Sequence, residues 1–190
     1  MKTSYIFLAP GFEEIEAVAP IDIMRRAGMP VTTVSIAPSQ PTVIGAHGVP
    51  YVADITIDQL PAEIDAEWLI LPGGMPGATN LLECKALANL LCDFPGNIAA
   101  ICASPSVVLA QLGLLKGKKA TCYPGMEAYN ANCSEVNFTG NHVELDGRFL
   151  TGQGPAWAIA FGAAIVEKSL GHDAAKTVLD GMLVPDQCRR

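Results

Sequence analysis

The segment Ile98-Ala99-Ala100-Ile101-Cys102-Ala103-Ser104-Pro105-Ser106-Val107-Val108-Leu109 contains the most informative change of pattern in this chain. Apolar residues of strand length come first, then Cys102 and two small residues, then a proline at a plausible first turn of a helix. This order predicts a sharp strand-to-helix turn that projects Cys102 from the carboxyl end of a strand. The amino end of the helix would favour a thiolate. The alternative is a buried structural cysteine, because free cysteine packs as a small apolar residue.

Short apolar strands alternate with helical segments on both sides of this turn. Such alternation implies a mostly parallel sheet covered by helices on both faces. We therefore predict an α/β fold with a single domain over residues 1–190. We expect strands at 5–9, 31–36, 68–71, 98–101 and 119–122, helices at 13–27, 81–92, 105–113, 155–170 and 173–183, and antiparallel strands at 136–138, 142–145 and 148–151.

Composition excludes several classes of protein. Half of the residues are hydrophobic and 16% are charged, which indicates a compact globular chain. A net charge of −7 argues against nucleic-acid and anionic-membrane partners. The uncharged stretches 98–115 and 149–166 contain internal breakers, so we expect a strand plus a helix in each and no membrane span.

The six cysteines form no CxxC pair, and we see no export signal. We therefore expect reduced thiols in a cytoplasmic protein and no zinc site.

Ligands bind beyond the carboxyl ends of parallel strands, where several motifs should meet. One holds Glu13, Glu14 and Glu16 at the start of a helix. We expect Glu13 and Glu14 to face water, as acids in a first turn commonly do. Glu16 cannot share a face with Glu14, although spacing alone does not settle its direction. An inward Glu16 beside Cys102 would have a raised pKa and would hydrogen-bond the sulfur.

The pair Gly73-Gly74, at the carboxyl edge of the predicted sheet, could present backbone N–H groups to a ligand. The N–H groups of Gly74 and Ala103 would form a two-donor oxyanion hole for a sulfur adduct of a carbonyl. A tight turn without chemical function is the alternative. A further strand end carries Gly154 and Pro155, which we include as candidate binding residues.

A catalytic cysteine usually works with a histidine, and this chain has three. We expect His142 and His172 on the surface. His47 follows a turn and is the one that could approach Cys102, although a loop histidine more commonly faces solvent.

Four motifs in this order resemble the ThiJ/PfpI superfamily, also called the DJ-one family, over nearly the whole chain. The match is closest to the branch that holds the human parkinsonism-associated protein and its bacterial relatives. The motifs are residues 8–17, Leu71-Pro72-Gly73-Gly74, Ala99-Ala100-Ile101-Cys102-Ala103 and Leu150-Thr151-Gly152-Gln153-Gly154-Pro155.

The resemblance implies a flavodoxin-like three-layer sandwich with Cys102 as the nucleophile, Glu16 as its acid partner, and Gly74 and Ala103 as oxyanion donors. It also implies a homodimer formed through the first helix, including Ile15 and Arg26, and no cofactor. Relatives are described as glyoxalases, protein deglycases, redox-responsive chaperones and peptidases.

Three positions depart from that pattern. Tyr123 stands where relatives with a Cys-His pair often carry histidine, and tyrosine is a poor base near neutral pH. Ser104 stands where the branch commonly has Gly or Ala, and His47 where close relatives usually have Arg. We keep Tyr123 and His47 as candidate binding residues.

Three functions remain open. The first is a cofactor-independent glyoxalase or deglycase that acts on small 2-oxoaldehydes or glycated groups through Cys102. The second is a stress protein or chaperone that senses oxidation at Cys102. The third and weaker one is a cysteine peptidase or amidase, which needs a histidine within reach of the sulfur.

Overall fold

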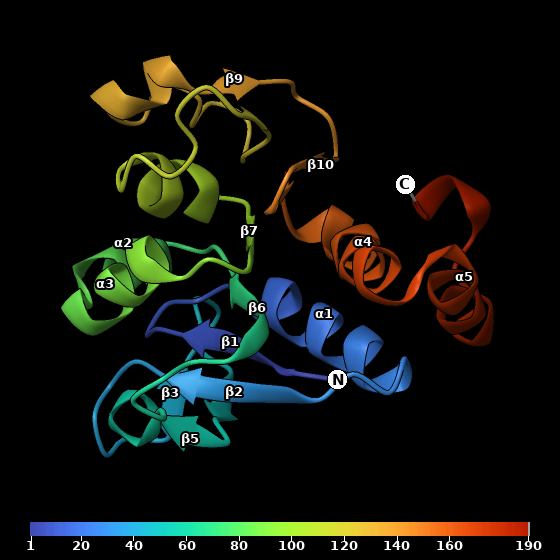
Figure 1. Ribbon diagram of the computed structural model, residues 1–190, viewed down its shortest axis with the longest axis horizontal. Coiled ribbons are helices and arrows are strands. Elements are labelled where there is room, and N and C mark those ends of the chain that lie inside the picture. The colour runs from blue at the N-terminus through green and yellow to red at the C-terminus, as the bar shows by residue number, and fades with distance from the viewer. Residues whose placement is uncertain (190) are drawn as a thin grey trace.

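The computed structural model describes residues 1–189, and its centre is a seven-stranded sheet (Figure 1). The strand order is β10-β11-β7-β6-β1-β2-β5, and every neighbouring pair is parallel except β10 with β11. The strands are β1 Thr3–Leu8, β2 Val31–Ser35, β5 Ile55–Thr56, β6 Ala66–Leu71, β7 Asn97–Ile101, β10 Val143–Asp146 and β11 Phe149–Gly152.

Helices cover both faces of this sheet. Figure 1 shows α1, α4 and α5 on one side and α2 and α3 on the other, and α1 packs closely against α4. The α-helices are α1 Glu14–Arg26, α2 Gly77–Glu83, α3 Lys85–Asp93, α4 Ala158–Leu170 and α5 His172–Gly181. The short helices are Ile57–Gln59, Pro105–Ala110, Ala131–Glu135, Pro155–Trp157 and Asp186–Cys188. This arrangement is the predicted α/β sandwich with a mostly parallel sheet.

The core lies along the three central strands β1, β6 and β7. Because helices cover both faces, these strands are apolar on both sides rather than alternating. Trp68 and Phe7 are fully buried, and the Trp68 indole donates a hydrogen bond of 2.8 Å to Ser169 Oγ on α4. Burying each side chain of this size stabilises the fold by about 1.5–3 kcal/mol.

Two small sheets lie outside the main one. In the first, β3 Thr42–Ile44 and β4 Pro50–Val52 form an antiparallel hairpin. In the second, β8 Lys119–Ala120 and β9 Asn137–Phe138 pair in parallel. The expectation that strand 136–138 runs antiparallel is therefore wrong. The hairpin of β10 and β11 is antiparallel as expected, with Gly147 at a positive φ of 63° in its turn.

Three predicted helices differ from the observed ones. The segment 81–92 belongs to two helices, α2 and α3, because Cys84 has an extended backbone with ψ of 95°. The helix expected at 105–113 is a π-helix of only six residues, Pro105–Ala110. The segment expected at 155–170 begins with a 3₁₀ turn, Pro155–Trp157, and continues as α4.

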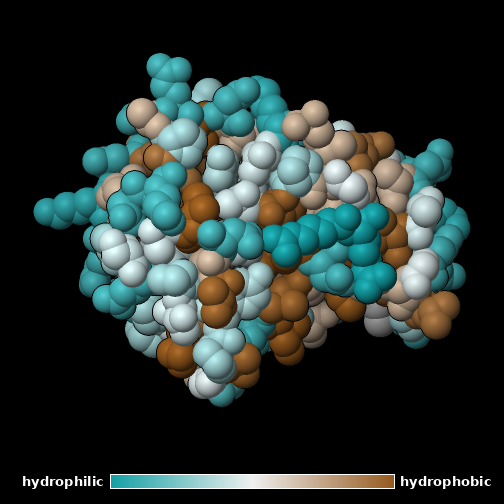
Figure 2. Space-filling view, turned by 90° about the horizontal axis from the view of Figure 1, so that it is seen from below, coloured by the Kyte–Doolittle hydropathy of each residue, from teal (hydrophilic) through white to brown (hydrophobic). Residues whose placement is uncertain are grey.

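Within residues 1–189, no helix has both the length and the apolar composition to cross a membrane. The two uncharged stretches become β7 plus the π-helix and β11 plus α4, because breakers divide them. Figure 2 shows one outer face, on which apolar residues form small groups among hydrophilic ones.

Candidate active site

Cys102 follows directly after β7 and occupies a strained backbone conformation. Its φ is 64°, a left-handed value that is rare for a residue with a side chain. Two backbone hydrogen bonds hold this conformation: Cys102 N donates to Gly152 O at 2.9 Å, and Tyr123 N donates to Cys102 O at 2.8 Å. The side chain is 8% exposed. The predicted sharp turn is therefore present, and it is tied to β11 and to the segment after β8.

Ser104 fixes the other side of the turn. Its buried hydroxyl donates a hydrogen bond of 2.6 Å to the carbonyl of Pro72, at the end of β6. This contact links the Cys102 turn to the Gly73-Gly74 segment. The π-helix that follows is an irregularity often found at functional sites.

Glu16 points inward and is fully buried beneath Cys102. Its Oε2 accepts a hydrogen bond of 2.8 Å from Gly73 N. The carboxyl lies beside the Cys102 thiol, which influences its pKa, and its Oε1 has no hydrogen-bond partner among the described residues. A Cβ at Gly73 would lie 2.6 Å from the Cys102 Cβ and 2.7 Å from Glu16 Oε2, so only glycine fits between the two groups.

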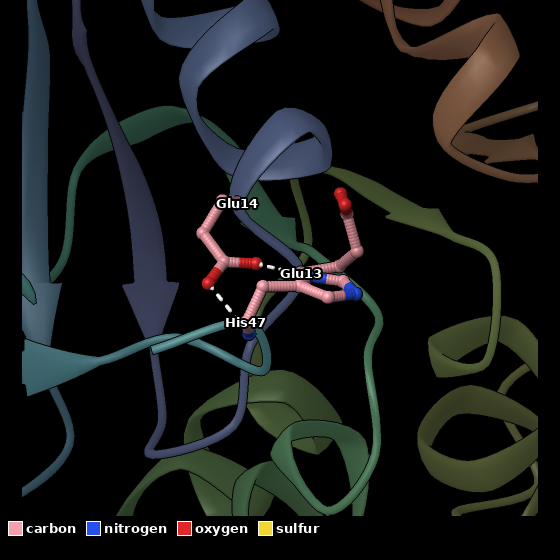
Figure 3. Close-up of side chains that lie close together, drawn as sticks. All are labelled: Glu13, Glu14 and His47. Atoms are coloured by element: carbon pink, nitrogen blue, oxygen red, sulfur yellow. Dashed lines mark hydrogen bonds and ion pairs between the residues drawn. The ribbon is translucent and has the colours of Figure 1, made fainter. Parts of the chain in front are cut away.

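The expectation that Glu13 and Glu14 face water is wrong. Glu13 is 8% exposed and caps α1: its Oε2 accepts a hydrogen bond of 2.7 Å from Glu16 N. Glu14 is folded over the loop that contains His47 (Figure 3). The first turn of α1 therefore uses all three carboxylates for specific contacts.

Burial governs the ionisation of the Cys102–Glu16 pair. Burial raises the pKa of Glu16 to about 7, against the hydrogen bonds from Cys102 and Gly73 that lower it. Burial, followed by the charge of Glu16 and its hydrogen bond, also raises the pKa of Cys102. The expectation of an acidic thiol is thus wrong. The pair accommodates one negative charge more readily than two, so protonation of Glu16 removes one of the causes that oppose the thiolate, while burial continues to oppose it.

The two proposed oxyanion donors converge on the sulfur. Gly74 and Ala103 line the same hollow as the Cys102 sulfur, and their backbone N–H groups act to lower its pKa. Gly74 has a φ of 85°, and a Cβ there would lie 2.5 Å from Glu13 N and 2.6 Å from Gly11 O. The close approach of these backbone segments explains why glycine is required at this position.

The hollow over the sulfur has a volume of about 370 Å³. Two larger hollows, of about 470 and 570 Å³, lie elsewhere and do not include Cys102. The smaller one contains Cys102. It is lined by Gly74, Met75, Cys102, Ala103, Tyr123, Pro124, Gly125 and Met126. Of these, the two methionines were not singled out from the sequence, because no local pattern distinguishes them from core methionines.

The remaining candidate residues lie outside the lining of this hollow. A Cβ at Gly154 would lie 3.5 Å from the Tyr123 ring, so Gly154 supports that ring from behind. Pro155 begins the 3₁₀ turn before α4. Among residues 1–189, no histidine lines the hollow. His142 is exposed and stacks on Trp157, and His172 is exposed and contacts Glu167, as expected for surface positions.

His47 is paired with Glu14 at the start of α1 (Figure 3). Its backbone N and ring Nδ1 lie 2.7 and 2.8 Å from the two Glu14 oxygens, and its side chain is 71% exposed. These contacts outweigh partial burial and lower the pKa of Glu14, while Glu14 raises the pKa of His47. Glu13, Glu14 and His47 offer ligand atoms within 4.8 Å of one another, but both Glu14 oxygens already accept hydrogen bonds.

The chain is similar in sequence to proteins of a known family. Residues 2–168 match the model of the DJ-1/PfpI family. The "Parkinson disease protein 7 homolog" of Danio rerio is 34% identical over 188 residues, covering 97% of this chain and 98% of that protein. "Deglycase PH1704" of Pyrococcus horikoshii is 31% identical over 159 residues, covering 82% and 92%. "Protein DJ-1 homolog A" of Arabidopsis thaliana is 38% identical over 96% of this chain, which spans only 47% of that relative.

The fold is shared with solved structures as well. The structure titled "Toxoplasma gondii DJ-1, oxidized" superposes with a TM-score of 0.89 at 33% identity, over 96% of this chain and 98% of that one. A family match over most of the chain and relatives of matching length lead to one conclusion. The chain belongs to the DJ-1/PfpI family.

Proposed function

We propose that the protein converts small 2-oxoaldehydes to 2-hydroxy acids, or acts on the corresponding glycated groups, through Cys102 and without a cofactor. One observation carries the proposal: Cys102, Gly74 and Ala103 line one hollow, and the buried carboxyl of Glu16 lies behind the sulfur. The name of the Pyrococcus relative, a deglycase, agrees with this chemistry.

The first step uses the ionised sulfur. The Cys102 thiolate adds to the aldehyde carbon, and the carbonyl electron pair moves to oxygen, where the N–H groups of Gly74 and Ala103 stabilise the charge. Protonation of this oxygen gives a hemithioacetal.

The second step is a proton transfer within the adduct. Glu16, in its carboxylate form, removes the proton from the former aldehyde carbon and returns it to the neighbouring keto carbon, while the hydroxyl proton of the hemithioacetal moves to the keto oxygen. The aldehyde carbon is thereby oxidised and the keto carbon reduced, giving a thioester of a 2-hydroxy acid. Water then cleaves the thioester, which releases the acid and restores the thiol. A Glu16 pKa of about 7 allows this group both to hold and to release a proton near neutral pH.

The proposal is tested with purified protein and methylglyoxal, with lactate measured as the product. We expect turnover by the wild type and none by Cys102→Ala. Cys133→Ala is a matched control, because Cys133 is also buried but lies outside the hollow. Equal inactivity of wild type and Cys102→Ala would contradict the proposal.

A redox-responsive role is the second candidate, and the orphan Oε1 of Glu16 favours it. Peroxide oxidises a thiolate to sulfenic and then sulfinic acid with loss of water, and a protonated Glu16 would hydrogen-bond the new oxygen atoms. Mass spectrometry after mild peroxide treatment should find two added oxygens at Cys102 and unmodified remaining cysteines. Uniform oxidation of all cysteines would count against this role.

We also propose a homodimer formed through α1. Ile15 and Val18, three residues apart on this helix, are 57% and 46% exposed and offer adjacent apolar side chains that a second copy would cover. Arg26, at the end of the helix, pairs with Asp22 within the same chain. Light scattering should give twice the chain mass for wild type and the single chain mass for Ile15→Glu. A monomeric wild type would contradict this.

A further inference from the structure

The walls of the hollow beyond the sulfur are apolar. Four side chains form them: Met75, Tyr123, Pro124 and Met126. Among the residues that the structure describes, no charged side chain lines the hollow. A volume of about 370 Å³ is also more than a three-carbon aldehyde occupies, and it lies in the size range of sites that hold larger ligands.

Two of these walls are exposed to solvent, and the backbone that carries them lies next to the reactive centre. Met75 is 47% exposed and follows the oxyanion donor Gly74 in the chain. Tyr123 is 48% exposed, and its backbone N–H is held by the carbonyl of Cys102. Both side chains are therefore placed relative to the sulfur by the same backbone that builds the reactive centre. Large exposed apolar side chains beside a reactive group are typical of a ligand-binding surface.

Building on the proposed function, we propose that this hollow is a subsite for an apolar substituent, best filled by an aromatic ring. The substrate class is then an uncharged 2-oxoaldehyde whose keto carbon carries an aryl or larger alkyl group. Methionine sulfur contacts ring edges favourably, and Tyr123 offers a ring for stacking or edge contact. Apart from Cys102 and Glu16, residues 1–189 supply this hollow with no cation for a substrate carboxylate and no anion for an ammonium group.

The kinetic test compares phenylglyoxal with methylglyoxal. For the wild type we expect kcat/KM to be roughly tenfold or more higher for phenylglyoxal, because burial of the larger apolar group strengthens binding. Tyr123→Phe should retain the preference, since the ring remains. Tyr123→Ser should lower the ratio of kcat/KM for phenylglyoxal to kcat/KM for methylglyoxal several-fold. An equal or lower kcat/KM for phenylglyoxal in the wild type would overturn the subsite while leaving the proposed function intact.

A second measurement does not require turnover. The alkylation rates of Cys102 by N-phenylmaleimide and N-ethylmaleimide are measured by mass spectrometry and each divided by the rate for glutathione. We expect the normalised ratio to favour the phenyl reagent by about two- to tenfold in the wild type. Tyr123→Ser should bring the ratio close to one.

Tyr129→Ser is the matched control, because Tyr129 is also 48% exposed and lies outside the hollow. It should keep the wild-type ratio. A normalised ratio near one in the wild type, or an equal loss in Tyr129→Ser and Tyr123→Ser, would overturn the inference. Failure of all 2-oxoaldehydes to react, together with a retained phenyl preference in alkylation, would support the subsite and reject the proposed function.

Discussion

Glu14 and Glu16 lie two residues apart on α1 and have opposite environments. Glu16 is fully buried under Cys102, and burial raises its pKa to about 7. Glu14 lies at the outer side of the same turn, where hydrogen bonds from the His47 loop lower its pKa. The carboxyl of Glu16 is thus suited to proton transfer near neutral pH, whereas the carboxylate of Glu14 holds the His47 loop. The difference shows that the surrounding backbone donors and solvent, rather than the helix terminus, decide the role of each carboxylate.

The largest effect is expected for Gly73→Ala, which disturbs the packing around the buried carboxylate of Glu16. The added Cβ would collide with the Cys102 Cβ and Glu16 Oε2 and would lie 2.9 Å from Ile101 O. We expect a loss of roughly 2–4 kcal/mol in the free energy of unfolding, measured by urea denaturation. Gly181→Ala, where a Cβ meets nothing within 4 Å, should stay within about 0.5 kcal/mol of wild type. Similar losses in both variants would contradict the packing argument.

Glu16→Gln should stabilise the protein in a pH-dependent way. Because the pKa of Glu16 in the folded protein is about 7, above its ordinary 4.5, the folded state binds the proton more tightly. The contribution of Glu16 to the stability of the wild type is therefore fully present below pH 4.5 and is lost as the pH rises through 7. Glutamine removes this dependence, so the variant should be more stable by about 2–3 kcal/mol at pH 8 and equal near pH 4. Denaturation curves give the free energy of unfolding of both proteins. If the difference between Glu16→Gln and the wild type stays constant from pH 4 to pH 8, the pKa of Glu16 is not raised.

The same variant tests the coupling of the pair. In the wild type, the rate of Cys102 alkylation should rise with pH in two steps, because the sulfur and the Glu16 carboxyl titrate together. Glu16→Gln should reduce the profile to a single step. Stopped-flow alkylation between pH 5 and 10 provides the measurement, and a one-step profile in the wild type would contradict coupling.

Glu14→Gln should show the opposite pH dependence with a smaller magnitude. The pKa of Glu14 is lowered in the folded protein, so the carboxylate contributes stability above its unfolded pKa. This contribution is lost as the pH falls through the lower folded pKa. We expect the variant to be less stable by about 0.5–1 kcal/mol at pH 7 and equal to wild type at strongly acidic pH. Greater stability of Glu14→Gln at pH 7 would remove the contrast with Glu16.

The smallest effect is expected for His47→Ala. The ring is mostly exposed and lies outside the hollow, so its loss should change the alkylation rate of Cys102 by less than about twofold. The pKa of Glu14 should rise toward its ordinary value, which NMR titration of the carboxyl can follow. If His47→Ala lowers the alkylation rate of Cys102 as much as changes at Glu16 do, then His47 contributes to the reactivity of Cys102.

Local sequence patterns predicted the sheet and the positions of its strand ends well. The bounds of strands β1, β2, β6 and β7 fall within two residues of the predicted ones, since buried parallel strands are short apolar runs with clear breakers. The break at Cys84 and the π-helix after Pro105 were not predictable, because both depend on packing between α2, α3 and the Cys102 turn. The parallel pairing of β8 with β9 likewise depends on contacts between segments distant in the chain.

Within the site, the strand-to-helix turn indicated Cys102, and the family resemblance implied Glu16, Gly74 and Ala103 as its partners; the structure brings these residues together. The inward turn of Glu13 and the pairing of Glu14 with His47 were not visible, because helical spacing cannot show which loops lie against a first turn. The methionines of the hollow were missed for the same reason: their role depends on which side of the fold they line.

The amino-acid order by itself determined where strands end in small residues and glycines, and therefore which residues reach the carboxyl edge of the sheet. This follows because steric and apolar requirements act between near neighbours in the chain. Only the tertiary structure decided the ionisation of the Cys102–Glu16 pair, the capture of His47 by Glu14 and the apolar walls over the sulfur. Each of these depends on desolvation and contacts between distant segments, which no local pattern records.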